Sequence, residues 1–86
     1  MPVISKFYGI IVRLLRVPGR GPAVYASYGE HEVVLDPVTL RVVSGVAPNR
    51  VVELVWEWAE LDRAELSVAL EELRIGHAPA TIAPLV

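Results

Sequence analysis

Cysteine is absent from this 86-residue chain, and His31 and His77 are its only histidines. Without cysteine the chain has no disulfide, no thiolate metal site and no thiol nucleophile. The two histidines show no ligand spacing such as His-x-His, so we expect no bound metal and no cofactor. The lack of cysteine is also typical of a reducing cytoplasm, where we expect the protein to reside.

Long hydrophobic runs are absent as well. The apolar stretch at residues 9–15 falls far short of the ~18–20 residues that span a membrane, and Arg13 interrupts it. Lys6, Arg16 and Arg20 flank it in a layout that does not match a signal peptide. We therefore expect no membrane segment.

Polar residues are scarce for so small a chain. Hydrophobic residues make up 53% of it and charged residues 21%, and the mean hydropathy is +0.47. A domain of this length leaves more than about a third of its unfolded-chain surface exposed, and this surface is expected to be polar. The apolar excess therefore predicts a covered surface, and we expect a homo-oligomer, specifically a dimer.

Charge is unevenly distributed along the chain. Residues 1–50 hold six basic and three acidic side chains, whereas residues 51–86 hold two basic and seven acidic ones. A basic half with tyrosines could bind nucleic acid by charge and by stacking on bases. The candidate residues for such a surface are Arg13, Arg16, Arg20, Tyr25 and Tyr28. The alternative is that these tyrosines border the core and the charges coat an ordinary surface.

The first half of the chain has the residue pattern of β-strands. Residues 4–15 are rich in β-branched and aromatic residues and predict one central strand covered on both faces. Two prolines and two glycines predict a loop at 17–22. Residues 24–28 and 31–36 are expected to pair around Gly29-Glu30, where glycine supplies the positive φ of a type II′ turn.

A second turn and a fourth strand complete the expected sheet. Pro37 is suited to position i+1 of a turn at 36–39. Residues 40–44 then predict the fourth strand, which Gly45 is expected to end.

From Pro48 the apolar period changes from two to 3.6, which predicts two helices. Trp58 is expected to point into the core and Trp56 to be partly exposed. Asp62 and Glu65 are expected to form a capping box between the helices, and Gly76 is expected to end the second one. The residues expected on the inward faces are Val51, Leu54, Val55, Trp58, Leu61, Leu66, Ala69, Leu70 and Leu73.

The sequence thus predicts a single domain over residues 1–86 with an α+β, two-layer fold. A four-stranded antiparallel sheet (1–47) is followed by two C-terminal helices (48–76) and an extended tail (77–86) that docks through Ile82 and Leu85. Ala64, Val68 and Ile75 form a second apolar stripe on the outer side of the second helix, with no obvious use within one chain, and Trp56 stands at the margin of the first helix. These four residues are the predicted dimer interface. The alternatives are a dimer through an exposed edge strand of the sheet and a tail that folds back over the stripe within one chain.

Four segments of the chain resemble a known family. MPVISKFYGIIVRL, AxYGEHEVVLD, WAELDRAEL and the closing I-x-PL are similar to the small prokaryotic family catalogued as domain of unknown function forty-one-sixty. The resemblance covers nearly the whole chain. It implies a sheet-plus-helices domain that is the toxin-like half of a two-gene toxin–antitoxin-type module, with a small antitoxin-like protein as partner. The positions that match the family are Phe7, Gly9, Tyr28, Glu32, Asp36, Trp58 and Glu60.

The chain departs from that family where its histidines stand. Residues 21–26 read Gly-Pro-Ala-Val-Tyr-Ala in place of Pro-Pro-His-Phe-His-Ala, so Ala23 and Tyr25 replace both histidines. Two histidines at i and i+2 on a strand share one face and could bind a metal or transfer protons. Asp62 also replaces a family histidine, and Ala69-Leu70 an Asn-Trp pair. Any activity that depends on these residues is lost here.

The residues alone also favour binding over catalysis. The serines lack the strand–turn–helix context of a hydrolase nucleophile, and we expect no catalytic residue. The expected function is a non-catalytic protein-interaction module, and the family resemblance implies that it is the toxin-like member of its pair. The alternatives are an RNA-directed toxin or nucleic-acid-binding protein, and a chain altered from its family that retains only the fold.

Overall fold

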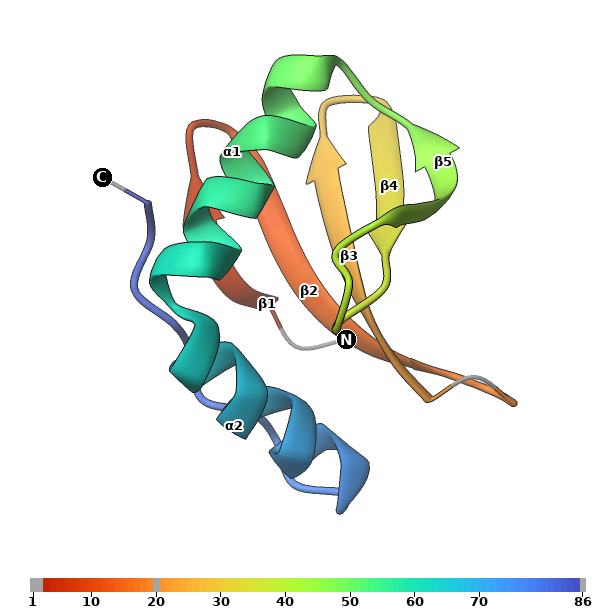
Figure 1. The fold of residues 1–86 in the computed structure, drawn as a ribbon, viewed down its shortest axis with the longest axis vertical. Coiled ribbons are helices and arrows are strands. Elements are labelled where there is room, and N and C mark those ends of the chain that lie inside the picture. Colours follow the sequence, from red (N-terminus) through yellow and green to blue (C-terminus); the bar gives the residue numbers. More distant parts are fainter. Residues whose placement is uncertain (1–2, 20, 86) are drawn as a thin grey trace.

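The first half of the chain forms one antiparallel sheet (Figure 1) in the computed structural model, which describes residues 3–19 and 21–85. Its strands follow one another in chain order, and each pairs with the next. They are β1 (Val3–Phe7), β2 (Ile10–Val17), β3 (Gly21–Tyr28), β4 (His31–Leu35) and β5 (Val42–Val46). The predicted α+β class is confirmed, but the sheet has five strands and the predicted number of four is wrong.

The extra strand arises because residues 4–15 fold as a hairpin. Phe7 pairs with Ile10, which leaves Tyr8 and Gly9 as a two-residue loop. Both loop residues have positive φ, 51° and 79°, as a type I′ turn requires. Tyrosine rarely adopts this conformation, so the sequence indicated an unbroken strand.

The predicted loop at 17–22 is shorter than expected, since Val17 pairs with Gly21 and Pro22 pairs with Arg16. The pairing of β3 with β4 begins only at Val24. Pro22 lies before that point, so β4 loses no hydrogen bond because proline has no N–H. The predicted hairpin turn at Gly29 is confirmed, with a φ of 57°.

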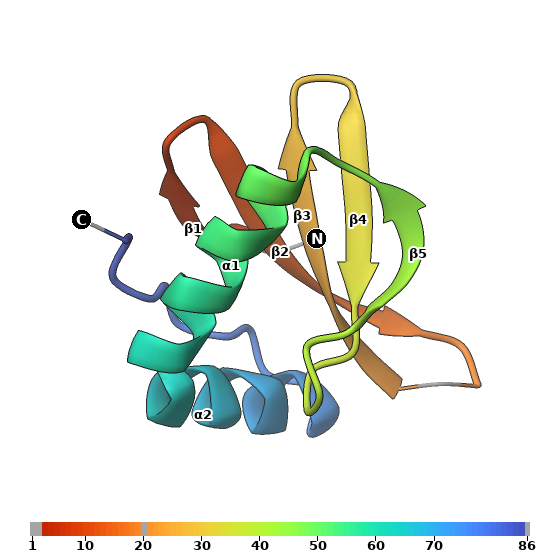
Figure 2. The same ribbon diagram turned by 45° about the horizontal axis from the view of Figure 1, so that its top comes forward.

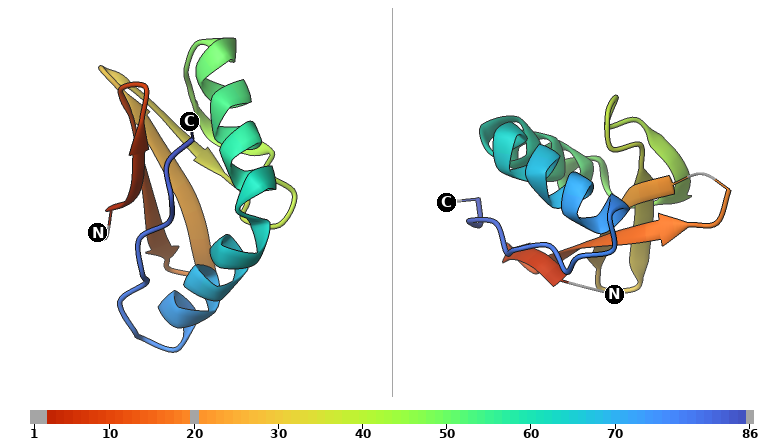
Figure 3. Two further views of the ribbon diagram at one scale, coloured as in Figure 1. Left: turned by 90° about the vertical axis from the view of Figure 1, so that its left-hand side faces the viewer. Right: turned by 90° about the horizontal axis from the view of Figure 1, so that it is seen from below.

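Both helices lie on one face of the sheet (Figures 2 and 3). They are α1 (Asn49–Leu61) and α2 (Arg63–Arg74). As predicted, Trp58 is fully buried; it stacks on Phe7, with ring centroids 5.8 Å apart. The largest fully buried side chains are Trp58, Ile4, Ile10, Leu14, Leu35, Val12, Val24, Val33 and Val55.

The C-terminal tail docks as predicted. Ile82 is buried, Leu85 packs partly against the core, and the Ile82 N–H donates to the Ile4 carbonyl oxygen at 2.7 Å. The tail therefore covers part of the edge of β1, which would otherwise be free to pair with another chain.

Two expectations about the helix junction are wrong. Leu61 is 73% exposed, because it is the last residue of α1 and the chain turns there. Asp62 makes no side-chain cap bond. Its φ of −112° and ψ of 29° are not the extended values from which an N-cap oxygen reaches the first turn. Leu66 donates instead to the Asp62 backbone oxygen.

The end of α2 is as predicted. Gly76 has a φ of 87°, and the N–H groups of Gly76 and His77 donate to the carbonyl oxygens of Leu73 and Glu72. These two bonds define a Schellman motif, which satisfies carbonyls that the helix leaves free.

The buried side chain of Ser5, on β1, provides a test of what an unpaired hydroxyl costs in stability. It is buried, and its hydroxyl has no hydrogen-bond partner. An unpaired buried hydroxyl is destabilising, so Ser5→Ala should leave the free energy of unfolding unchanged or raise it by up to about 1 kcal/mol. Urea titration measures this. A loss above about 1 kcal/mol would show that the hydroxyl is bonded in solution.

Candidate interaction surface

The face of the sheet opposite the helices carries several partly exposed apolar side chains. Along β2, Ile10, Val12 and Leu14 are buried under the helices, whereas the alternating Ile11 and Leu15 are partly exposed. Side chains of a strand point alternately to its two faces, so these two lie on the far side. Figure 3 shows no helix over that side. We call it the open face.

The strand register arranges the open face in rows that cross the sheet. One row runs Lys6, Ile11, Ser27, Glu32 and Val46 across all five strands. The next row runs Val3, Arg13, Tyr25, Val34 and Ser44. Tyr25 therefore lies on the central strand, between Arg13 and Val34.

The few charges on the open face are separated by sign. Lys6 and Arg13 lie on β1 and β2, whereas Glu32 lies on β4. The face thus has a basic side, an apolar centre and an acidic side.

The five predicted nucleic-acid residues do not form one surface. Arg13 and Tyr25 are cross-strand neighbours on the open face. Tyr28 pairs with Ile10 in the row that faces the helices, and its ring lies close to Gly9 at the end of the β1–β2 hairpin. Arg20 lies outside the described residues.

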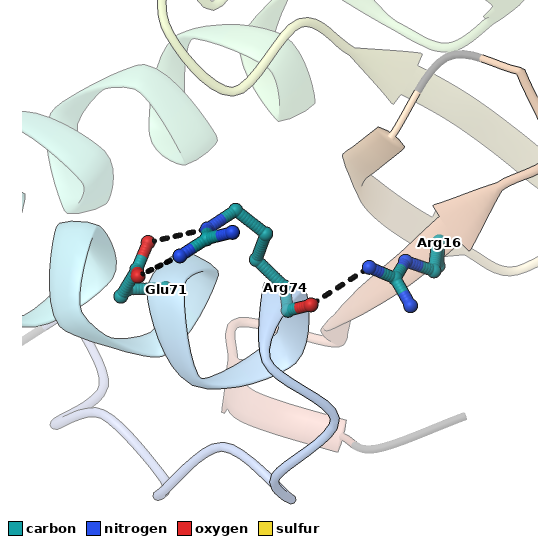
Figure 4. Close-up of polar contacts among 3 residues, drawn as sticks. All are labelled: Arg16, Glu71 and Arg74. Carbon is teal, nitrogen blue, oxygen red and sulfur yellow. Dashed lines mark hydrogen bonds and ion pairs between the residues drawn. The ribbon is translucent and has the colours of Figure 1, made fainter.

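Arg16 faces α2 (Figure 4). One of its terminal guanidinium nitrogens donates to the Arg74 carbonyl oxygen at 2.7 Å. A cation near the C-terminus of a helix satisfies a free carbonyl and complements the helix dipole. The Arg74 side chain bonds Glu71, with 2.9 Å between Nε and Oε2, and this contact lowers the pKa of Glu71 and raises that of Arg74. Arg16 thus joins the sheet to α2.

The four predicted dimer residues lie in two places. Trp56 is 43% exposed and borders a groove beside β5, with Val42 and Val46. Its indole N–H donates to the Leu40 oxygen at 2.7 Å.

Ala64 and Val68 border another groove between α2 and the tail, with Ala80 and Ile82. The tail leaves Val68 60% exposed and Ile75 51% exposed. The outer side of α2 is therefore not covered by the tail at these two residues.

Asp36 organises the turn between β4 and β5. Its Oδ1 accepts hydrogen bonds from the N–H groups of Val38 at 2.8 Å and Thr39 at 2.9 Å. These bonds, first that from Thr39 and then that from Val38, lower the pKa of Asp36. Aspartate fits here because its short side chain can bond the backbone two or three residues on.

The lowered pKa predicts how acid affects stability. Because the folded protein favours the ionised form, the stabilisation is complete above the ordinary aspartate pKa and is lost as pH falls through the lowered value. Asp36→Asn keeps an acceptor oxygen but does not titrate. Its melting temperature should therefore fall less than that of the parent between about pH 5 and pH 2. Identical acid dependence of the two melting temperatures would contradict the assigned role.

Among residues 3–19 and 21–85, no three histidine, aspartate or glutamate side chains gather as potential metal ligands. Within the same residues, no helix has the length and hydropathy needed to cross a membrane. Comparison with family models, curated proteins and solved structures gave no match. The family resemblance of the sequence remains a prediction.

Proposed function

We propose that this chain is a non-catalytic protein-interaction module that binds through the open face of its sheet. The observation that carries the proposal is a partly exposed apolar group on the face of the sheet opposite α1 and α2, made up of Ile11, Leu15, Tyr25 and Val34. A partner that covers these side chains removes apolar area from water, which is the main favourable contribution to protein association. The expected partners are a second copy and, from the family resemblance, a small antitoxin-like protein.

Composition supports this proposal. The chain has more apolar residues than its core uses, and the open face accounts for part of that excess. A group of partly exposed apolar side chains with few charges is the usual character of a protein-binding surface.

The second candidate function is nucleic-acid binding, favoured by the cross-strand pair Arg13 and Tyr25. An exposed arginine beside an aromatic ring suits a stacked base and its phosphate. Two features weigh against it. Arg16 bonds α2, and Glu32 on the same face would repel a phosphate backbone.

Co-expression with the product of the adjacent gene tests the proposal. The two proteins should co-purify at a fixed ratio, and Val34→Glu on the open face should abolish this. Val68→Glu on the outer side of α2 is the matched control and should have no effect. Expression of the chain alone should slow growth, and co-expression should relieve this, if the chain is toxin-like. Co-purification that Val34→Glu leaves intact would contradict the use of the open face.

Fluorescence anisotropy with a short single-stranded RNA tests the second candidate. If the chain binds only proteins, the anisotropy of the labelled RNA should not change at micromolar protein. Binding that weakens steeply with salt and is lost in Arg13→Gln would favour the nucleic-acid function instead.

A further inference from the structure

We infer that a second copy of this chain covers the open face in the isolated protein, packed face to face about a two-fold axis parallel to the strands. The inference rests on the proposed function, because it names the partner of the same surface. Tyr25, on the central strand β3, would lie at that axis and meet its own copy.

The area of the open face is sufficient for such a dimer. Five strands about 4.8 Å apart, each five to eight residues long at about 3.3 Å per residue, give a face of roughly 400–600 Å². This is about a tenth of the chain's accessible surface of 5252 Å², the usual share for one partner of a small protein. The two copies together bury about 1,000 Å², the lower limit for a specific interface.

The charges select the direction of the axis. Sheets that pack face to face keep their strands within about 30° of each other, so a two-fold axis in the interface runs either along the strands or across them. An axis across the strands would place each strand over its own copy, so the basic side with Lys6 and Arg13 would lie over the basic side of the second copy, and the acidic side with Glu32 over its acidic side. These like-charge contacts would be destabilising.

An axis along the strands, through β3, gives the opposite result. It places β2 over β4 of the second copy, so Arg13 lies over Val34 and one row from Glu32 of the other chain. Symmetry repeats this contact, so the dimer gains two ion pairs at the border of an apolar centre. The basic and acidic sides of the open face are thus complementary to each other in a two-fold dimer.

A charge exchange tests this arrangement. Arg13→Glu and Glu32→Arg, each alone, should raise the dimer dissociation constant by at least about tenfold, because each places like charges together twice. The double variant Arg13→Glu/Glu32→Arg should restore dimerisation to within a few-fold of the parent. Within one chain β3 separates these residues, so circular dichroism should show an unchanged fold. Single variants that dimerise like the parent, or a double variant that remains monomeric, would overturn the inference.

Chemical cross-linking tests the position of the axis, since the parent chain has no cysteine. Tyr25→Cys treated with a short bismaleimide should give a covalent dimer at micromolar concentration, and Val68→Cys should not. Cross-linking through Val68→Cys but not Tyr25→Cys would place the interface on α2. A monomeric parent would also overturn the inference, yet loss of partner co-purification in Val34→Glu would then still support the proposed function.

Discussion

Trp58→Ala is expected to lower the free energy of unfolding by about 3–5 kcal/mol, the range for removing a large buried aromatic side chain. Trp58 is completely buried between α1 and the sheet, stacks on Phe7, and donates its indole N–H to the Ala83 oxygen at 3.0 Å. Truncation therefore opens a cavity, removes an aromatic pair and releases the tail. A chain of this length has a total stability of only about 4–13 kcal/mol, so the variant should be largely unfolded at modest urea concentration.

Trp56→Ala is the matched control two residues away. Trp56 is 43% exposed, so its loss removes the bond to the Leu40 oxygen, worth about 1 kcal/mol, and the packing of only part of the ring, and should cost less than the loss of Trp58. Urea titration followed by circular dichroism compares the two variants. Equal destabilisation would show that the assigned orientation of α1 is wrong.

Gly45→Ala is expected to destabilise the protein by about 2–4 kcal/mol, through backbone strain together with overpacking. Gly45 lies within β5 and has a φ of 84°. A Cβ at this position would overlap the backbone oxygen of Glu32. Because neither backbone can move without breaking the hydrogen bonds between β4 and β5, the end of β5 that contains Gly45 should separate from β4.

Gly76→Ala is the control that distinguishes the cost of backbone strain from the cost of steric overlap by the added Cβ. Gly76 has a similar φ, 87°, but an added Cβ would meet no atom within 4 Å. Its substitution should cost only about 1 kcal/mol, from the left-handed conformation alone. The two variants are compared by urea titration, and amide exchange in β5 should accelerate only in Gly45→Ala. If Gly45→Ala and Gly76→Ala lowered the free energy of unfolding by similar amounts, β5 would accommodate the added Cβ without further cost.

The local features of the fold were the most predictable from the sequence. The 3.6-residue period placed Trp58 inward, and Gly76 marked the end of α2, because both depend on residues close in the chain. Gly45 was predicted to end the last strand but lies inside β5. Its positive φ has a tertiary cause, the close approach of the Glu32 backbone, and residue type alone does not reveal that neighbour.

The candidate surface was harder to predict. The apolar run at 4–15 indicated a strand covered on both faces, whereas the structure places both helices on one face. The same residues fit either arrangement, since composition records only that a side chain is apolar and not what covers it. The predicted dimer residues Trp56 and Val68 lie in two places, because a break at Asp62 sets α1 and α2 at different orientations. Arg13 and Tyr25 were both identified as candidate binding residues. That they lie opposite each other on β2 and β3 depends on the strand register, which residue type alone does not reveal.

The molar mass of the isolated protein tests the central claim most directly. Light scattering coupled to size exclusion should give twice the 9.4 kDa chain mass for the parent at micromolar concentration. Val34→Glu on the open face should give the single-chain mass, while Val68→Glu should behave as the parent. A parent of 9.4 kDa, or a dimer that Val68→Glu dissociates and Val34→Glu does not, would contradict the account.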